Sequence, residues 1–298
     1  MKGLRRTAAI ACLCLTLLAG STAMASDSAE IILADGAISA DVPGVSVNGS
    51  TVTIAQAGSY RLSGTLSDGQ VVVDAPSGDV TLLLDGVHIG CASDAALLIL
   101  DAKLVTLTLA ESRENSLDGP SGYAPDSEAD AVLFSKSDLV INGSGALTVT
   151  APAGDGIASR DTLTIEGGRL NITAADHGIK GKDYLLILDG GITVSAGGDG
   201  MKSTNDTQDA LGYVEIRGGS FAISADDDGI SAVTRITLLG GTCAIQTGNN
   251  GMKSDSLIDI QAGDITIDTR DDDFVCETLT GSGNATITIN GEAISLGG

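Results

Sequence analysis

The sequence predicts an all-β fold, a single-stranded parallel β-helix (a solenoid) with about 22 residues per coil. A polar residue followed by Gly and an apolar residue recurs at a nearly constant interval, short apolar runs alternate between the recurrences, and a Gly column divides these runs. A fixed repeat of this length is typical of a solenoid, in which each unit stacks on its neighbours.

The recurring tripeptide begins at Asp155, and its copies are separated by 22, 22, 29 and 22 residues. The 29-residue interval equals one ordinary coil with seven extra residues, which we place within 204–210. Regular 22-residue coils are expected from about residue 131 to 290. The five copies are Asp155-Gly156-Ile157, His177-Gly178-Ile179, Asp199-Gly200-Met201, Asp228-Gly229-Ile230 and Asn250-Gly251-Met252.

Two further strands are expected in each repeat, on either side of a Gly. Leu163 and Ile165 precede Gly168 and Ile172 follows it, with the period-two alternation of a strand that buries one face. A recurring Gly at this place indicates a turn with positive φ or a close approach of two backbones. Connections of two to five residues are too short for helix-backed parallel strands. A β-sandwich also uses short strands, but it gives no reason for a strict repeat length.

The first 25 residues have the pattern of a secretory signal peptide, and residues 26–298 are expected to form one β-helix domain. Lys2, Arg5 and Arg6 precede an apolar run, and Ala23-Met24-Ala25 resembles a cleavage site. The run is too short to span a bilayer, and no later stretch replaces it. We therefore predict a secreted or cell-surface protein without an integral membrane segment after cleavage. The polar stretch 111–130 is expected to protrude as a surface loop.

The charge of the chain excludes some partners. Three of the 16 Lys and Arg and none of the 39 Asp and Glu lie in the first 25 residues, so residues 26–298 carry 13 basic and 39 acidic residues, a formal net charge of −26. Nucleic acid and anionic membranes are poor partners for such a surface. Acidity alone also promotes solubility, so the positions of the acids carry more information than their number.

Three cysteines follow the first 25 residues, and their spacing indicates neither a metal site nor a disulfide framework. Cys91, Cys243 and Cys276 are odd in number and form no CxxC pair. Cys243 precedes Ile245 by two residues, so strand alternation turns both side chains inward. We expect Cys243 in the core, while the disulfide state of the three stays open.

Two polar columns follow from stacking the repeats in register, and both lie along one edge. The column before each tripeptide contains Gly154, Asp176, Gly198, Asp227, Asn249 and Asp271. The next column contains Asp155, His177, Asp199, Asp228, Asn250 and Asp272. Carboxylates on adjacent coils repel each other and cost stability unless a cation compensates them.

Calcium is the first candidate for that cation, because Ca²⁺ takes six to eight oxygen ligands from carboxylates, amides and carbonyls. Two His and no paired Cys make softer metals a poor fit. The extra residues within 204–210 could add ligands beside Asp199. The ligand candidates at this point are the acids of the two columns together with Asn205 and Asp206 of the insertion.

Lysine is the second candidate. Lys180, Lys202 and Lys253 form one column, three residues after the inner polar position. These residues either neutralise the carboxylates or bind an anionic ligand, and the sequence leaves both open. His177 is interpreted as a surface turn residue, and no Ser/His/Asp arrangement or phosphate-binding loop is visible.

Several segments resemble the bacterial carbohydrate-binding β-helix family known from cellulose-degrading clostridia. The resemblance implies an extracellular, right-handed β-helix that contains calcium and binds plant-type polysaccharides such as cellulose and polygalacturonate. It also implies a fold relationship to the family-nine pectate lyases, which pair Ca²⁺ with a Lys base. Carried over to this sequence, the resemblance places the calcium ligands at Asp176, Asp199, Asp206, Asp227, Asp228, Asp271 and Asp272. The segments that carry the resemblance are Tyr60-Arg-Leu-Ser-Gly-Thr65, Ser137-Asp-Leu-Val-Ile-Asn-Gly143, His177-Gly-Ile-Lys-Gly-Lys-Asp183, Gly198-Asp-Gly-Met-Lys-Ser-Thr-Asn-Asp206 and Asp227-Asp-Gly-Ile-Ser-Ala232.

Three functions remain open from the sequence. The first is a non-catalytic module that binds acidic polysaccharide through Ca²⁺, with Lys180, Lys202, Lys253 and Tyr184 as candidate ligand-binding residues. The second is a calcium-dependent lyase, for which the resemblance places the base at Lys180, Lys182 or Lys202. The third is a surface spacer without a sugar ligand. The low content of aromatic residues, 2% with no Trp, argues against binding of flat crystalline cellulose.

Overall fold

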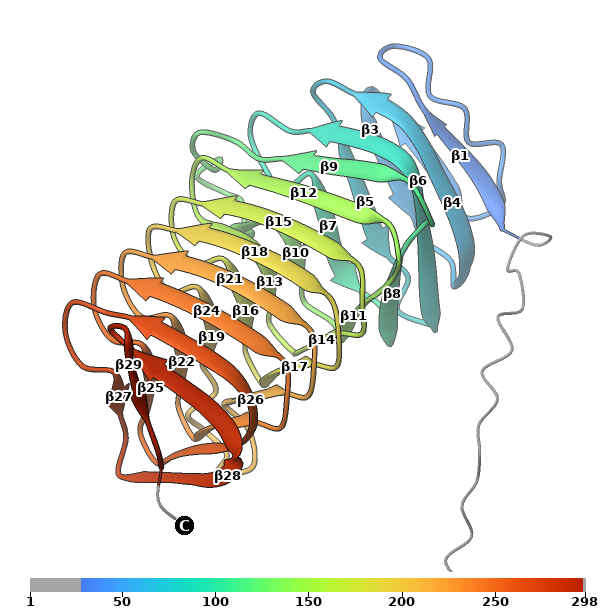
Figure 1. The fold of residues 1–298 in the computed structure, drawn as a ribbon. Helices are drawn as coiled ribbons and strands as arrows, with labels where there is room; N and C mark the ends of the chain where they lie inside the picture. Colours follow the sequence, from blue (N-terminus) through green and yellow to red (C-terminus); the bar gives the residue numbers. More distant parts are fainter. Residues whose placement is uncertain (1–27, 297–298) are drawn as a thin grey trace, which may run out of the picture.

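The computed structural model describes residues 28–296, which form a parallel β-solenoid of about 10 turns with about 23 residues per coil (Figure 1). These residues are strands, turns and loops without a helix, which confirms the predicted fold. None of them therefore belongs to a helix that could cross a membrane. The predicted signal peptide, residues 1–25, lies outside the described residues.

Each regular coil contributes three strands, and equivalent strands stack into two sheets. The first sheet has 11 strands, all but β2 paired in parallel. Its members are β2 (Val45–Asn48), β3 (Thr51–Ile54), β5 (Gln70–Asp74), β7 (Leu97–Asp101), β10 (Ala131–Ser135), β13 (Asp155–Ser159), β16 (Ile179–Gly181), β19 (Met201–Ser203), β22 (Ile230–Ala232), β25 (Met252–Ser254) and β27 (Phe274–Val275).

The second sheet has 18 strands and holds the other two strands of each coil. The pre-turn and post-turn strands belong to one sheet because four long strands run through both positions. The long strands are β4 (Gly58–Leu66), β6 (Asp79–Gly90), β26 (Leu257–Asp268) and β28 (Thr278–Ile289). The pre-turn strands are β8 (Leu104–Leu109), β11 (Leu139–Gly143), β14 (Thr162–Ile165), β17 (Tyr184–Ile187), β20 (Tyr213–Ile216) and β23 (Arg235–Leu238). The post-turn strands are β9 (Glu114–Asp118), β12 (Ala146–Ala151), β15 (Arg169–Ala174), β18 (Gly191–Ala196), β21 (Ser220–Ala225) and β24 (Thr242–Thr247), while β1 (Ala29–Leu33) and β29 (Glu292–Ile294) lie at the two ends.

The observed register keeps the intervals of the sequence repeat. Ile157 pairs with Ile179, which pairs with Met201, and Met201 pairs with Ile230 across the 29-residue coil. The extra residues of that coil lie between β19 and β20, as the repeat predicts. In these coils the inward residues therefore stack on their equivalents in the next coil.

The core is one continuous apolar stack along the axis of the solenoid. Leu163, Ile165 and Ile172 are fully buried, and Cys243 is 3% exposed, which confirms its predicted core position. Cys91, Cys243 and Cys276 are all free thiols. Gly168, between the two strands, has a φ of 92°, a conformation that favours Gly.

The two ends of the stack differ from its middle. An antiparallel β2–β3 pair lies near the first end and an antiparallel β28–β29 pair closes the other. The prediction of a surface loop over 111–130 is partly wrong, because β9 continues the sheet there and only residues 119–130 leave it. Alternating inward side chains in Glu114–Asp118 are too few to stand out from the surrounding polar residues.

Candidate functional site

The inner polar column (Asp155, His177, Asp199, Asp228 and Asn250) lies where the 18-stranded sheet turns into the 11-stranded sheet. Each side chain accepts the backbone N–H of the next member of the column. The His177 N–H donates to Asp155 Oδ1 at 3.0 Å, and the Asp199 N–H donates to His177 Nδ1 at 3.0 Å. The Asp228 N–H donates to Asp199 Oδ1 at 3.0 Å, and the Asn250 N–H to Asp228 Oδ1 at 3.2 Å. The column therefore holds successive coils together.

The buried carboxylates of this column each face one lysine. Asp155, Asp199 and Asp228 are only 1–2% exposed, so their charges need partners. The lysine row (Lys180, Lys202 and Lys253) supplies them. The ion pairs are Lys180–Asp155, Lys202 Nζ–Asp199 Oδ2 at 2.6 Å and Lys253 Nζ–Asp228 Oδ2 at 3.5 Å. This one-to-one pairing favours neutralisation as the role of the lysines toward the inner column. We call the inner column and the lysine row together the Asp–Lys edge.

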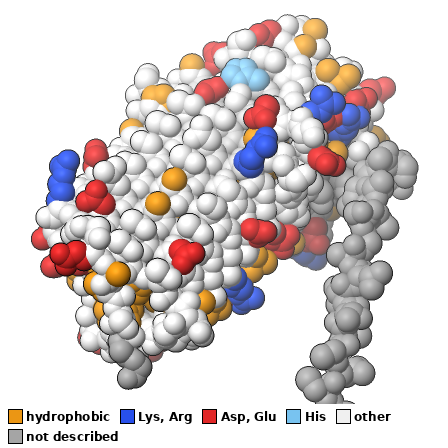
Figure 2. Space-filling model, in the orientation of Figure 1, with side chains coloured by type: hydrophobic (Ala, Val, Ile, Leu, Met, Phe, Trp, Pro, Cys, Tyr) orange, Lys and Arg blue, Asp and Glu red, His pale blue; other side chains and the backbone are white. Residues whose placement is uncertain are grey.

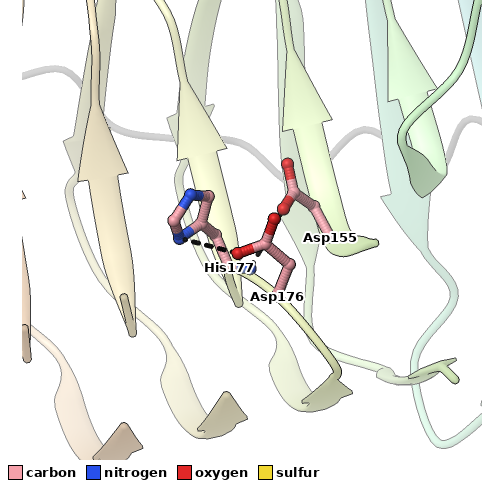
Figure 3. Close-up of side chains that lie close together, drawn as sticks. All are labelled: Asp155, Asp176 and His177. Atoms are coloured by element: carbon pink, nitrogen blue, oxygen red, sulfur yellow. Dashed lines mark hydrogen bonds and ion pairs between the residues drawn. The ribbon is translucent and has the colours of Figure 1, made fainter. Parts of the chain in front are cut away.

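Two groups on this edge bring three metal-type ligand atoms within 4.8 Å of one another. The first is Asp155, Asp176 and His177, where the imidazole Nδ1 lies 3.5 Å from Asp176 Oδ1 (Figure 3). The second is Asp199, Asp227 and Asp228, which consists of carboxylates only. Because calcium prefers oxygen ligands, the second group is the better calcium candidate.

Asp227 distinguishes that second group. Its side chain is exposed, whereas Asp199 and Asp228 are buried and paired with lysines. Its Oδ1 accepts a hydrogen bond from Asn249 Nδ2 at 2.8 Å, and the same amide donates to Asp228 at 3.0 Å. The group thus carries three carboxylates, two lysines and one amide, which leaves a net negative charge open to solvent.

Lys180 is the most enclosed member of the lysine row. It pairs with Asp155 and also lies 3.1 Å from Asp130 of the segment 119–130. Burial lowers the pKa of Lys180, but the two carboxylates more than offset this effect, so the pKa is raised above its ordinary value. Lys180 is therefore an ammonium at neutral pH and a poor proton acceptor.

The structure separates several predicted ligands from this edge. Asn205 and Asp206 follow β19, so this strand lies between them and Asp199. Asn205 Nδ2 donates to Asp183 Oδ1 at 2.5 Å, and its Oδ1 accepts from the Thr207 backbone at 2.9 Å. The expectation that the inserted residues lie beside Asp199 is wrong, because the insertion leaves the coil at the opposite end of β19.

The remaining predicted site residues lie at the surface. Asp271 and Asp272 continue the two polar columns through backbone hydrogen bonds, but both side chains are exposed. Lys182 is also exposed and lies at the end of β16 away from the Asp–Lys edge. Neither the two acids nor Lys182 joins the two groups of ligand atoms described above.

Tyr184 belongs to a stacked row on the outside of the pre-turn strands. Its ring stacks on Tyr213 with 5.1 Å between centroids, and the Arg235 guanidinium lies 3.9 Å from the centroid of the Tyr213 ring. One face of the Tyr184 ring is therefore covered. The row stabilises neighbouring coils. Because the rings cover each other, less aromatic surface is left for a sugar than two separate rings would offer.

A third carboxylate row was not predicted from the sequence. Asp138, Asp161 and Asp183 lie on successive coils at the corner after the 11-stranded sheet, and Asp138 accepts the Thr162 N–H at 3.3 Å. Burial, with added repulsion from Asp138 and a hydrogen bond to Asp183, raises the pKa of Asp161 to about 6. Their spacing of 23 and 22 residues was a usable signal, but no common tripeptide marks it.

Comparison with known proteins assigns the chain to a family. The family of carbohydrate-binding domain-containing proteins matches residues 48–296, most of the described solenoid. The chain belongs to this carbohydrate-binding domain family. The clostridial resemblance predicted from the sequence is thereby confirmed.

Two relatives of this family member are informative. A carbohydrate-binding domain-containing protein of Acetivibrio thermocellus is 35% identical over 153 residues, which are 49% of this chain and 54% of the relative, so the chain spans about half of the relative's length. A solved structure of a polysaccharide lyase-like protein from C. thermocellum, in a gadolinium derivative, is 31% identical with a TM-score of 0.75. That match covers 88% of this chain and 99% of the other.

Proposed function

We propose that this carbohydrate-binding protein holds acidic polysaccharide without cleaving it, through Ca²⁺ bound at Asp199, Asp227 and Asp228. The convergence of these three carboxylates carries the proposal, since their ligand atoms lie within 4.8 Å of one another on a chain of strong negative charge. A polyanion can approach such a surface only where a cation intervenes. When bound, Ca²⁺ would link protein carboxylates to those of a uronate polymer.

The residues present fit calcium on chemical grounds. All three side chains are hard oxygen donors, and the exposed Asp227 leaves the group accessible from solvent. Lys202 and Lys253 are 27% and 45% exposed at their side chains, so both can also reach a uronate carboxylate. The metal and the lysines would then act on the same strip of polymer.

Catalysis by a lysine base is the second candidate, which the polysaccharide lyase-like relative favours. A lyase must remove the proton next to the uronate carboxylate, and a lysine can take it only in its neutral, deprotonated form. Lys180 is held as an ammonium by two carboxylates, and Lys202 and Lys253 each face a buried aspartate. We therefore propose binding as the function. Formation of unsaturated uronate product by the wild-type protein, lost in the Lys202→Ala variant, would instead support the lyase.

Calcium titration calorimetry and affinity electrophoresis in polygalacturonate gels test the proposal. Asp227→Ala should abolish calcium binding and remove the calcium-dependent retardation, because it deletes the exposed ligand. Asp206→Ala is a matched control, since Asp206 is an exposed Asp away from the Asp–Lys edge. Retardation that persists in chelator, or equal loss in both variants, would contradict the proposal.

Export of the protein is part of the same proposal. The signal-like pattern in residues 1–25 supports it, together with the polysaccharide ligand proposed here. N-terminal sequencing of the protein from culture medium should begin near Ser26. Recovery of the uncleaved chain from the cell interior alone would contradict it.

A further inference from the structure

A shallow groove runs along the outer face of the post-turn strands; its central part lies away from the Asp–Lys edge, and its last hollow borders that edge at Asp226 and Gly248. Three hollows with volumes of about 430, 430 and 320 Å³ make it up. The first two share Thr193 and Ala222, and the last two share Ser224 and Gln246, so the hollows are continuous. From β12 to β26 the groove crosses five inter-strand steps, about 24 Å at the usual strand spacing.

The middle of this groove carries no charge. The outward positions of β18, β21 and β24 hold Gly, Ser, Thr, Ala and Gln, without an Asp, Glu, Lys or Arg. Charged residues line the groove only beyond these strands, with Glu114 and Arg169 in the first hollow and Asp226, Asp268 and Arg270 toward the other end. The same face is largely white in Figure 2, with most charged side chains towards its rim. In a protein of net charge −26 after residue 25, such a face is unexpected.

The side chains in the groove are small and mostly hydroxylic. Ala222 and Ala244 are exposed at central strand positions, although Ala is depleted in strands. Thr193, Ser195 and Ser224 line the groove beside them and are also exposed. Short side chains let a ligand lie close to the sheet, and hydroxyl groups both donate and accept hydrogen bonds.

We infer that this uncharged groove is a second binding site, which takes a neutral, extended polysaccharide chain lying along the axis of the solenoid. A neutral polymer has hydroxyl groups that match those of the groove, and it requires no desolvation of charge. A polyanion would find no cation on the three central strands and would meet Asp226, Asp264 and Asp268 at the end where Arg270 lies. The carbohydrate-binding family match covers all of these strands.

This site goes beyond the calcium-dependent function proposed above, because it needs neither metal nor lysine. The two sites lie on different faces of the same coils, so one protein could hold an acidic and a neutral polysaccharide together. The groove site can be tested independently of the Asp–Lys edge, since the two sites differ in residues, charge and calcium requirement.

Affinity electrophoresis in β-1,4-glucomannan gels, run in chelator, tests the groove. Wild-type protein should be retarded, and Thr193→Arg combined with Ala222→Arg should weaken binding at least tenfold by filling the central hollows. Thr237→Arg is the matched control, because Thr237 points outward on β23, outside the groove. It should bind as wild type does.

A parallel measurement separates this inference from the proposed function. The groove double variant should keep its calcium-dependent retardation in polygalacturonate, whereas Asp227→Ala should keep glucomannan binding. Absence of glucomannan binding in the wild type would overturn the inference, as would unchanged binding in the double variant. Loss of polygalacturonate binding in the groove double variant would also overturn it, by assigning the groove to the acidic polymer.

Discussion

The Asp–Lys edge and the uncharged groove lie on the same coils but are specified in different ways. On the edge, side chains such as Asp199 are buried, hydrogen-bonded to the next coil and paired with lysine. In the groove, side chains such as Thr193 are exposed and contribute little to the stack. A solenoid thus separates its tasks by column, since one residue position holds the coils together and another, a few residues away, is left facing solvent.

Substitution of the Gly of the repeated tripeptide, compared with a Gly at the groove, is expected to give the largest difference in stability. A Cβ on Gly200 would lie 2.3 Å from Ile223 Cγ2 and 2.7 Å from the Gly229 carbonyl oxygen, whereas one on Gly191, at the groove, would meet nothing within 4 Å. We expect Gly200→Ala to lower the free energy of unfolding by about 3 kcal/mol. Gly191→Ala should leave it nearly unchanged. Urea denaturation of both variants measures this, and equal effects would refute the distinction.

Removal of a buried carboxylate should have the next largest effect. Asp228 Oδ1 accepts from the Asn250 backbone at 3.2 Å and from its side-chain amide at 2.7 Å. Asp228→Ala leaves these donors without their acceptor, at a cost of about 2 kcal/mol. Asp227→Ala, at the exposed neighbour, should change stability by less than about 0.5 kcal/mol. Denaturation in chelator excludes any contribution of metal, and a large loss in Asp227→Ala would contradict the division between the two columns.

The sequence repeat was sufficient for the fold and for the stacking of the polar columns. Asp155, Asp199 and Asp228 each precede a position so close to the neighbouring strand that only Gly fits there. The three residues therefore align, and the register follows directly from the spacing of the repeat. The pairing of lysines was harder to predict. Lys202 pairs within its own coil, while Lys253 reaches one coil back, because its own coil offers Asn250 rather than a carboxylate.

Two features depended on information that spacing lacks. Asn205 lies beside Asp183 rather than Asp199, because the insertion leaves the coil after β19. The number of inserted residues does not predict this direction. The groove is defined by outward residues without charge, and these have no motif in the sequence. Such a surface is recognised only once the neighbouring coils are placed together.

The Asp138–Asp161–Asp183 row differs from the Asp–Lys edge, because no lysine within residues 28–296 forms an ion pair with it. Asp161 has a folded pKa of about 6, above the value of about 4 for an unfolded Asp. The folded state therefore binds the proton more tightly, and its stability falls as pH rises from about 4 to about 6. Asp161→Asn should remove this dependence and raise the melting temperature at pH 7 by roughly 2–4 °C, or about 1 kcal/mol. Calorimetry at pH 4.5 and 7 measures the difference, and a variant stabilised equally at both values would contradict it.

The smallest expected effect is the stability change of the groove variants. Thr193 and Ala222 are exposed, and no hydrogen bond from the Thr193 hydroxyl to the protein is described among residues 28–296. Thr193→Arg and Ala222→Arg should therefore each change the free energy of unfolding by less than about 0.5 kcal/mol. The same denaturation series measures them beside Gly200→Ala. A stable protein that has lost only its neutral ligand would show that the groove is free to serve binding, because the coils are held together by the columns on either side of it. A loss as large as that of Asp228→Ala would instead make the groove part of the structural framework.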